Sequence, residues 1–119
     1  MIRNSEKVYD LEERTTLFSE NLIDLCKKAP KNIVTIPIID QALRSGTSMG
    51  ANYSEANGAS SKKDFRNKIF ICKKEGKETM YWLRLLAKAA KEVAEECRVL
   101  WKEAHELTLI FSKISNNSK

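Results

Sequence analysis

The sequence predicts an all-α fold, an antiparallel up-down-up-down four-helix bundle, on three observations. Apolar residues recur at steps of three and four in three separate segments, which places them on one face of each helix, and small residues recur every four positions in another segment. Only 2 prolines and 4 glycines occur in 119 residues, too few for an all-β fold with many turns. The four segments also have similar lengths, roughly 27–40 Å at 1.5 Å per residue. We expect one domain over residues 1–119, with its core at about 10–114 and loose tails at both ends.

The first helix is expected from about Leu11 to Lys28. Asp10 can cap it, and Glu13 completes a capping-box pattern three residues later. Pro30 lies just beyond the expected end, where proline is common. The predicted apolar face consists of Leu11, Thr15, Phe18, Leu22 and Leu25.

The second helix is expected from about Ile36 to Asn57, with Thr35 as its cap and Gly58 in the left-handed conformation at its end. Small residues recur on it every four positions: Ala42, Gly46, Gly50, Ser54 and Gly58. A glycine within a helix costs about 1 kcal/mol relative to alanine. We interpret this ridge as a site of close approach by another helix, with Gly76 as a candidate partner. Backbone approach to a ligand is the alternative.

The third helix is expected from about Lys62 to Lys88, after a Ser61 cap, and the fourth from about Ala94 to Ile114. The predicted seam of the third helix is Phe65, Ile69, Cys72, Gly76, Thr79, Leu83 and Leu86. The predicted seam of the fourth is Cys97, Leu100, Ala104, Leu107, Phe111 and Ile114. Such spacing favours nearly antiparallel packing at about 20°.

Polar side chains crowd the second helix, where a solvated face would usually carry Lys and Glu. We expect a partly buried polar network there, with Arg44 paired to Glu55, Glu75 or Glu78. Trp82 flanks the apolar seam, a position that favours core or interface over base stacking. The predicted network or interface residues are Gln41, Arg44, Ser48, Asn52, Glu55, Glu75, Glu78 and Trp82.

Basic residues concentrate in the third helix. The net charge of the chain is +5, and residues 61–89 hold nine Lys or Arg against three Asp or Glu. Cations beside the apolar seam form a stripe that can contact phosphates, although a solvated helix face is the alternative. The candidate nucleic-acid residues are Lys62, Lys63, Arg66, Lys73, Lys77 and Arg84.

No sequence pattern predicts catalysis, a cofactor or a metal. Three cysteines occur without C-x-x-C spacing, and we expect buried free thiols. His105 lacks a glutamate three residues before it, and Glu75 and Glu78 lack a neighbouring histidine. No apolar run approaches the roughly 20 residues of a membrane span, and no signal peptide occurs. We therefore expect a non-enzymatic cytoplasmic protein with no membrane partner.

The segment from Gln41 to Ala56, QALRSGTSMGANYSEA, resembles the signature of four-helix-bundle proteins encoded in 23S ribosomal RNA intervening sequences. The resemblance continues through SKKDF at 61–65, Lys74-Glu75, Glu78-Thr79 and YWL at 81–83, and extends from about residue 14 to 111. It implies a bacterial four-helix bundle assembled as a homopentameric ring. It also implies relatedness to accessory proteins of diversity-generating retroelements, which are basic and contact nucleic acid and reverse transcriptase. It implies no known catalytic activity.

Three functions follow as hypotheses. The first is a self-assembling scaffold that contacts RNA or DNA. The second is a protein-interaction module without nucleic-acid affinity. The third, an enzyme, would have to use residues such as Arg44, Glu55 and Glu75 across an interface.

Overall fold

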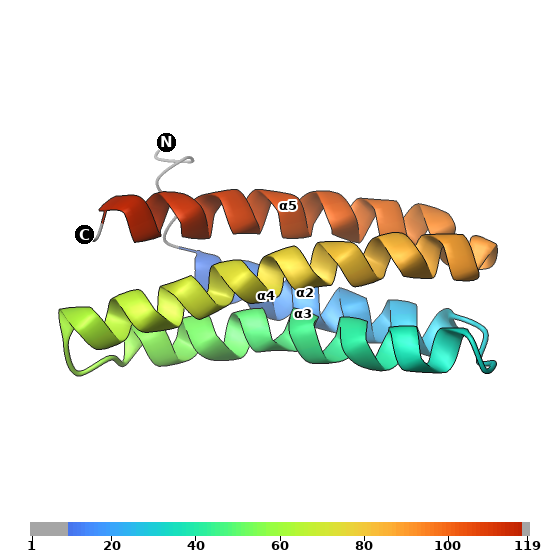
Figure 1. Cartoon of the computed structure of the whole chain (residues 1–119), viewed down its shortest axis with the longest axis horizontal. Coiled ribbons are helices and arrows are strands. Elements are labelled where there is room, and N and C mark those ends of the chain that lie inside the picture. Colours follow the sequence, from blue (N-terminus) through green and yellow to red (C-terminus); the bar gives the residue numbers. More distant parts are fainter. Residues whose placement is uncertain (1–9, 118–119) are drawn as a thin grey trace.

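The computed structural model describes residues 10–117, whose helices form the predicted antiparallel bundle (Figure 1). Its helices are α2 (Leu11–Lys28), α3 (Thr35–Asn57), α4 (Lys62–Ala89) and α5 (Ala94–Asn117), and a 3₁₀ turn (Lys91–Val93) precedes α5. The α3–α4 turn lies at the same end as the C-terminus, and the other two connections lie at the opposite end. No strand occurs within the described residues, so the all-α prediction is confirmed.

The start of α3 differs from the prediction. Thr35 is not the cap but the first residue of the helix, and its hydroxyl donates to Pro30 O at 2.6 Å. Asn32 satisfies the helix start instead, because its Oδ1 accepts the N–H groups of Val34 and Thr35, each at 2.9 Å. A side chain in the preceding loop therefore performs the capping expected of a residue three positions later.

Two other predicted caps were wrong and one was right, although α2 begins at Leu11 and α3 ends at Asn57 as predicted. Asp10 makes no side-chain hydrogen bond to α2. Gly58 has a φ of −100°, outside the left-handed region. Ser61 does cap α4, and its Oγ accepts the Asp64 N–H at 3.0 Å. The expected tail after Ile114 is also wrong for residues 115–117, which belong to α5, and the expected N-terminal tail lies outside the described residues.

The predicted seams form the core. The seam residues of α2, α4 and α5 are buried, except Phe65 and Ile114, which are half-buried. α3 adds Met49 and the small residues Ala42 and Gly46 from its inner face. The heptad-like spacing therefore identified the buried face of three helices correctly.

The glycines of α3 lie against α2, as expected for close helix packing. A Cβ atom at Gly46 would overlap Leu22 Cδ2, and one at Gly50 would lie 3.2 Å from Thr15 Cβ. Gly76 is not their partner, because a Cβ there would overlap Thr108 Oγ1 of α5. Two different helix pairs thus use glycine to approach closely.

The bundle is flattened, with extents of 44 × 32 × 19 Å, and α2 and α5 make the least extensive contact between neighbouring helices. Arg14 crosses this α2–α5 side. Its Nε and Nη2 donate to the two carboxylate oxygens of Glu103 at 3.1 and 2.9 Å, and Nη2 also contacts Glu106. The hydrogen bond to Glu103 raises the pKa of Arg14 although burial opposes it.

Candidate nucleic-acid interface on α4

The six cations predicted to contact nucleic acid do not share one surface. Lys62, Lys63, Lys77 and Arg84 are exposed, whereas Arg66 and Lys73 are half-buried on the flank of α4. The sequence pattern therefore combined residues of the exposed face with residues of its edge.

The structure defines a continuous exposed face on α4, which we call the outer face. Its members recur at steps of three and four and lie opposite the buried seam. They are Lys63, Asn67, Phe70, Lys74, Lys77, Tyr81, Arg84 and Lys88. Five of the eight are cations and none is an acid, so the outer face carries concentrated positive charge.

Sequence reasoning missed Lys74, Lys88 and Phe70 on this face. The signal was present, because these residues follow the same three-and-four spacing as the seam but half a turn away from it. Counting only the cations beside the seam selected Arg66 and Lys73 instead. A search for the positions opposite the seam would have found the outer face.

The outer-face cations are not engaged by other side chains through hydrogen bonds or ion pairs within residues 10–117. No hydrogen bond or ion pair in this range involves Lys63, Lys74, Lys77, Arg84 or Lys88. Lys68, at the α3 side of the helix, is different, because its Nζ pairs with Glu55 Oε1 at 2.6 Å. Free ammonium and guanidinium groups are what a polyanion can neutralise.

Two aromatic rings stand on the outer face among the cations. Phe70 and Tyr81 are each 57% exposed. The Tyr81 ring meets the Trp82 ring edge-on, with centroids 5.0 Å apart and planes at 76°. Trp82 is itself half-buried, and its Nε1 donates to Glu78 Oε2 at 3.1 Å. Tyr81 is therefore supported by a ring that is held in place.

The residues of the predicted polar network lie on α3 and α4. Its half-buried members are Gln41, Ser48, Asn52, Glu75, Glu78 and Trp82. Most of its hydrogen bonds stay within one helix, as when Asn52 Nδ2 donates to Ser48 Oγ at 2.9 Å. Between the helices, Thr79 Oγ1 lies 3.0 Å from Ser45 Oγ in the core. Burial raises the pKa of the Glu75 carboxyl, and neighbouring Glu78 raises it further.

The predicted partner of Arg44 was wrong. Arg44 is 74% exposed, and its Nε donates to Asp40 Oδ2 at 3.1 Å, one turn earlier on the same helix. Because the guanidinium is solvated, it needs no buried carboxylate. Glu55 pairs with Lys68 instead, and that pair links the ends of α3 and α4.

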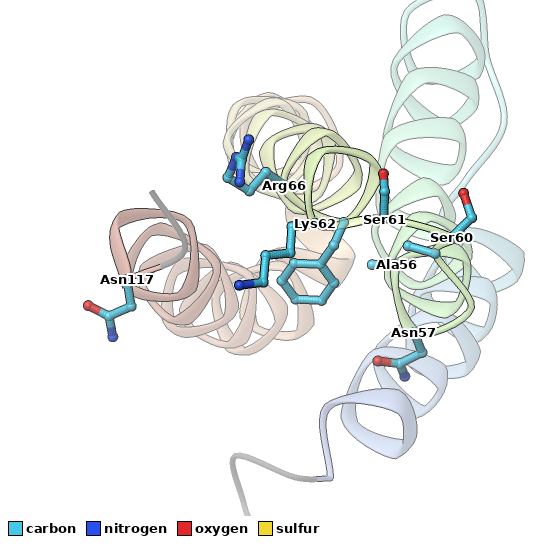
Figure 2. A pocket seen from close by; sticks show the side chains of 9 residues that line it. Ala56, Asn57, Ser60, Ser61, Lys62, Arg66 and Asn117 are labelled. Carbon is cyan, nitrogen blue, oxygen red and sulfur yellow. The ribbon is translucent and has the colours of Figure 1, made fainter.

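An open hollow of about 630 Å³ lies where the α3–α4 turn meets the C-terminal end of α5 (Figure 2). Lys62 extends into it toward α5, while Arg66 leaves the first turns of α4 in a different direction. Ser60, Ser61 and Asn117 also line the hollow. It adjoins the Lys63 end of the outer face and adds polar groups there.

The groups considered for catalysis or metal binding are dispersed or buried. All three cysteines are buried, and burial raises the pKa of Cys72 to about 12 and of Cys97 to about 11. The His105 ring lies 5.2 Å from the Trp101 ring. In residues 10–117 no cluster of three or more His, Cys, Asp or Glu side chains is arranged to hold a metal. None of the described helices is long and apolar enough to cross a membrane.

Comparison with known proteins identifies the family. No curated protein matched the chain significantly. A crystal structure of a protein with unknown function from the S23 ribosomal protein family of Bacteroides thetaiotaomicron VPI-5482 is similar, with 31% identity and a TM-score of 0.77 over 87% of this chain and 96% of that one. Residues 7–113 match the family described as 23S rRNA-intervening sequence protein. The chain therefore belongs to the 23S rRNA-intervening sequence protein family.

Proposed function

We propose that this protein is a non-enzymatic, self-assembling scaffold that contacts RNA or another nucleic acid through the outer face of α4. The observation that carries the proposal is the outer face itself, which presents five unpaired cations along one helix without an acid. From Lys63 to Lys88 the face is about 37 Å long at 1.5 Å per residue. A linear array of cations can contact several phosphates along a nucleic-acid strand.

Self-assembly is supported by apolar side chains that the single chain leaves exposed. On the α2–α5 side, Leu17 and Val99 are both more than half exposed. A hollow of about 350 Å³ lies beside Val99 and is also lined by Leu25 and Leu100. Exposed apolar groups beside a loosely packed seam are typical of surfaces that meet another subunit. Association of several chains would also multiply the outer faces available to one polyanion.

Light scattering tests the assembly. A ring of five 13.6 kDa chains, as the family resemblance implies, would have a mass of about 68 kDa. Val99→Glu should reduce that mass if the α2–α5 side is the contact, because a charge would be buried between subunits. His105→Glu, an exposed change elsewhere on α5, is the control. A wild-type mass of 13.6 kDa at micromolar concentration would contradict self-assembly.

A titration at two salt concentrations tests nucleic-acid contact. A fluorescent RNA should bind at low salt, and its affinity should fall as salt rises. Lys77→Glu should weaken binding for all sequences alike and make the salt dependence less steep. Lys27→Glu makes the same charge change on α2, which lies diagonally across the bundle, and should have little effect. Absence of binding at low salt, or equal losses in both variants, would refute the assignment of the outer face.

The second function that an observation favours is a protein-interaction module without nucleic-acid affinity. Ile33, Val34 and Ile36 are exposed together at the start of α3, and Ile33 is 90% exposed. They give the chain an apolar surface on a different helix from the basic one. This alternative predicts the same light-scattering result but no RNA binding, so the two experiments together separate the functions.

A further inference from the structure

We propose that the outer face of α4 recognises single-stranded rather than duplex nucleic acid, with bases stacked on Phe70 and Tyr81. This inference rests on the proposed function and specifies its ligand. It depends on the two aromatic rings, whereas the proposed function depends on the cations.

Phe70 and Tyr81 are spaced so that one nucleic-acid strand can contact both rings. Phe70 and Tyr81 are 11 residues apart on the same face, about 16 Å along the helix axis. Lys74 and Lys77 lie between them, and Lys63 and Arg84 lie beyond them on either side. A strand lying along α4 would therefore meet cations and rings alternately, the arrangement by which sequence-tolerant single-strand sites hold phosphates and bases.

A duplex could not use the rings. In a double helix the faces of the bases are stacked on one another, and only phosphates, sugars and base edges are accessible. A duplex would thus contact the cations of the outer face and leave Phe70 and Tyr81 exposed to water. An unpaired base can stack on either ring, and each such contact is worth roughly ten-fold in affinity.

The positive charge of the outer face favours a nucleic acid over a protein as its ligand. An apolar patch that binds a protein helix usually has a core depleted of charge. Here cations separate the two rings, and no acid lies on the face to pair with a partner's basic groups. Tyr81 is also supported edge-on by Trp82, which is fixed by its hydrogen bond to Glu78. A supported ring loses little conformational freedom when a base stacks on it.

The test compares a fluorescent oligouridine of about 12 nucleotides with a duplex of the same length, at one salt concentration. Wild-type protein should bind the single strand more tightly. The double variant Phe70→Ala, Tyr81→Ala removes both stacking contacts and should lose about 100-fold of the single-strand affinity with an unchanged salt dependence. Its affinity for the duplex should be unchanged. Phe70→Leu, Tyr81→Leu retains apolar bulk and helix propensity but no π face, and should show the same loss.

The control is Ile23→Ala, Leu109→Ala, which removes exposed apolar side chains from α2 and α5 and should leave single-strand binding unchanged. The double variant Lys74→Gln, Lys77→Gln should weaken the binding of both probes and reduce its salt dependence.

If the lysine variant loses binding but the aromatic variants do not, this inference is wrong and the proposed function stands. Tighter duplex binding by the wild type would also overturn it, as would a changed oligomeric mass in the aromatic variants. Failure of both probes to bind would overturn the inference and the proposed function together.

Discussion

Gly46 of α3 faces Leu22 of α2 with no space for a side chain between them. A Cβ atom at Gly46 would overlap Leu22 Cδ2, and Leu22 is fully buried, so it has little room to move. Close contact between the two helices offsets the cost of a glycine in a helix interior. The glycines in the interior of α3 are thus explained by the close approach of α2.

Gly46→Leu should therefore destabilise the fold by about 1–3 kcal/mol through overpacking. Urea unfolding of the variant and wild type measures the difference. Gly58→Ala is the matched control, because Gly58 is exposed, has a negative φ and has no close neighbour other than Glu55 O at 3.9 Å. The control should be neutral or slightly stabilising. Equal stability of Gly46→Leu and wild type would contradict the close packing of α2 and α3.

Arg14→Ala should destabilise the fold by about 1–2 kcal/mol, because Glu103 would lose a two-pronged ionic hydrogen bond at the α2–α5 side. Arg98→Ala breaks the exposed i,i+3 pair with Glu95 and should cost no more than about 0.5 kcal/mol. Thermal unfolding at low and moderate salt measures both. If the two variants lost equal stability, the Arg14–Glu103 pair would contribute no more than the exposed Arg98–Glu95 pair does.

Glu75→Gln should stabilise the fold at pH 7. Burial and Glu78 raise the pKa of Glu75 above 4.5, so the folded state favours the protonated form and ionisation at neutral pH costs stability. That cost arises as the pH rises through the folded pKa and is absent below 4.5. The gain from glutamine should therefore vanish in unfolding curves recorded below pH 4.5. A gain independent of pH would show that the effect is not electrostatic. Glu92→Gln, in the exposed turn before α5, is the control for the substitution itself.

Cys72 should resist alkylation in the native protein. Burial raises the pKa of its thiol to about 12, so almost no thiolate exists at pH 8, and solvent does not reach the sulfur. Iodoacetamide at pH 8 should modify it only after urea is added, as mass spectrometry can determine peptide by peptide. Cys97, with a pKa of about 11, should behave in the same way. Rapid labelling of Cys72 without denaturant would mean that α4 separates from α3 in solution.

The fold was largely predictable because apolar periodicity reports directly on burial. The seam of α2, from Leu11 to Leu25, was correct in every member. Helix ends were less predictable, since they depend on loop side chains such as Asn32, whose role at the start of α3 is set by the path of the loop. The conformation of Gly58 was also mispredicted, because a helix can end without a residue in the left-handed conformation.

The candidate site was only partly predictable. The basic character of α4 followed from its composition, but which cations share a face depends on which flank α5 covers. That packing half-buries Lys73 and leaves Lys74 exposed. The partner of Arg44 was missed although the sequence indicates it, because Asp40 lies four residues earlier on the same helix, the spacing of an ordinary ion pair on a helix surface.

The most direct measurement is photochemical cross-linking of the full-length protein to a single strand containing 4-thiouridine, followed by mass spectrometry of the peptides. A base stacked on a ring is in van der Waals contact with it, close enough for the irradiated thiouridine to form a covalent cross-link. We predict cross-links on Phe70 and Tyr81, on the exposed face of α4, and their loss at high salt. Cross-links confined to α2, α3 or α5 would contradict the assignment of this face as the nucleic-acid contact.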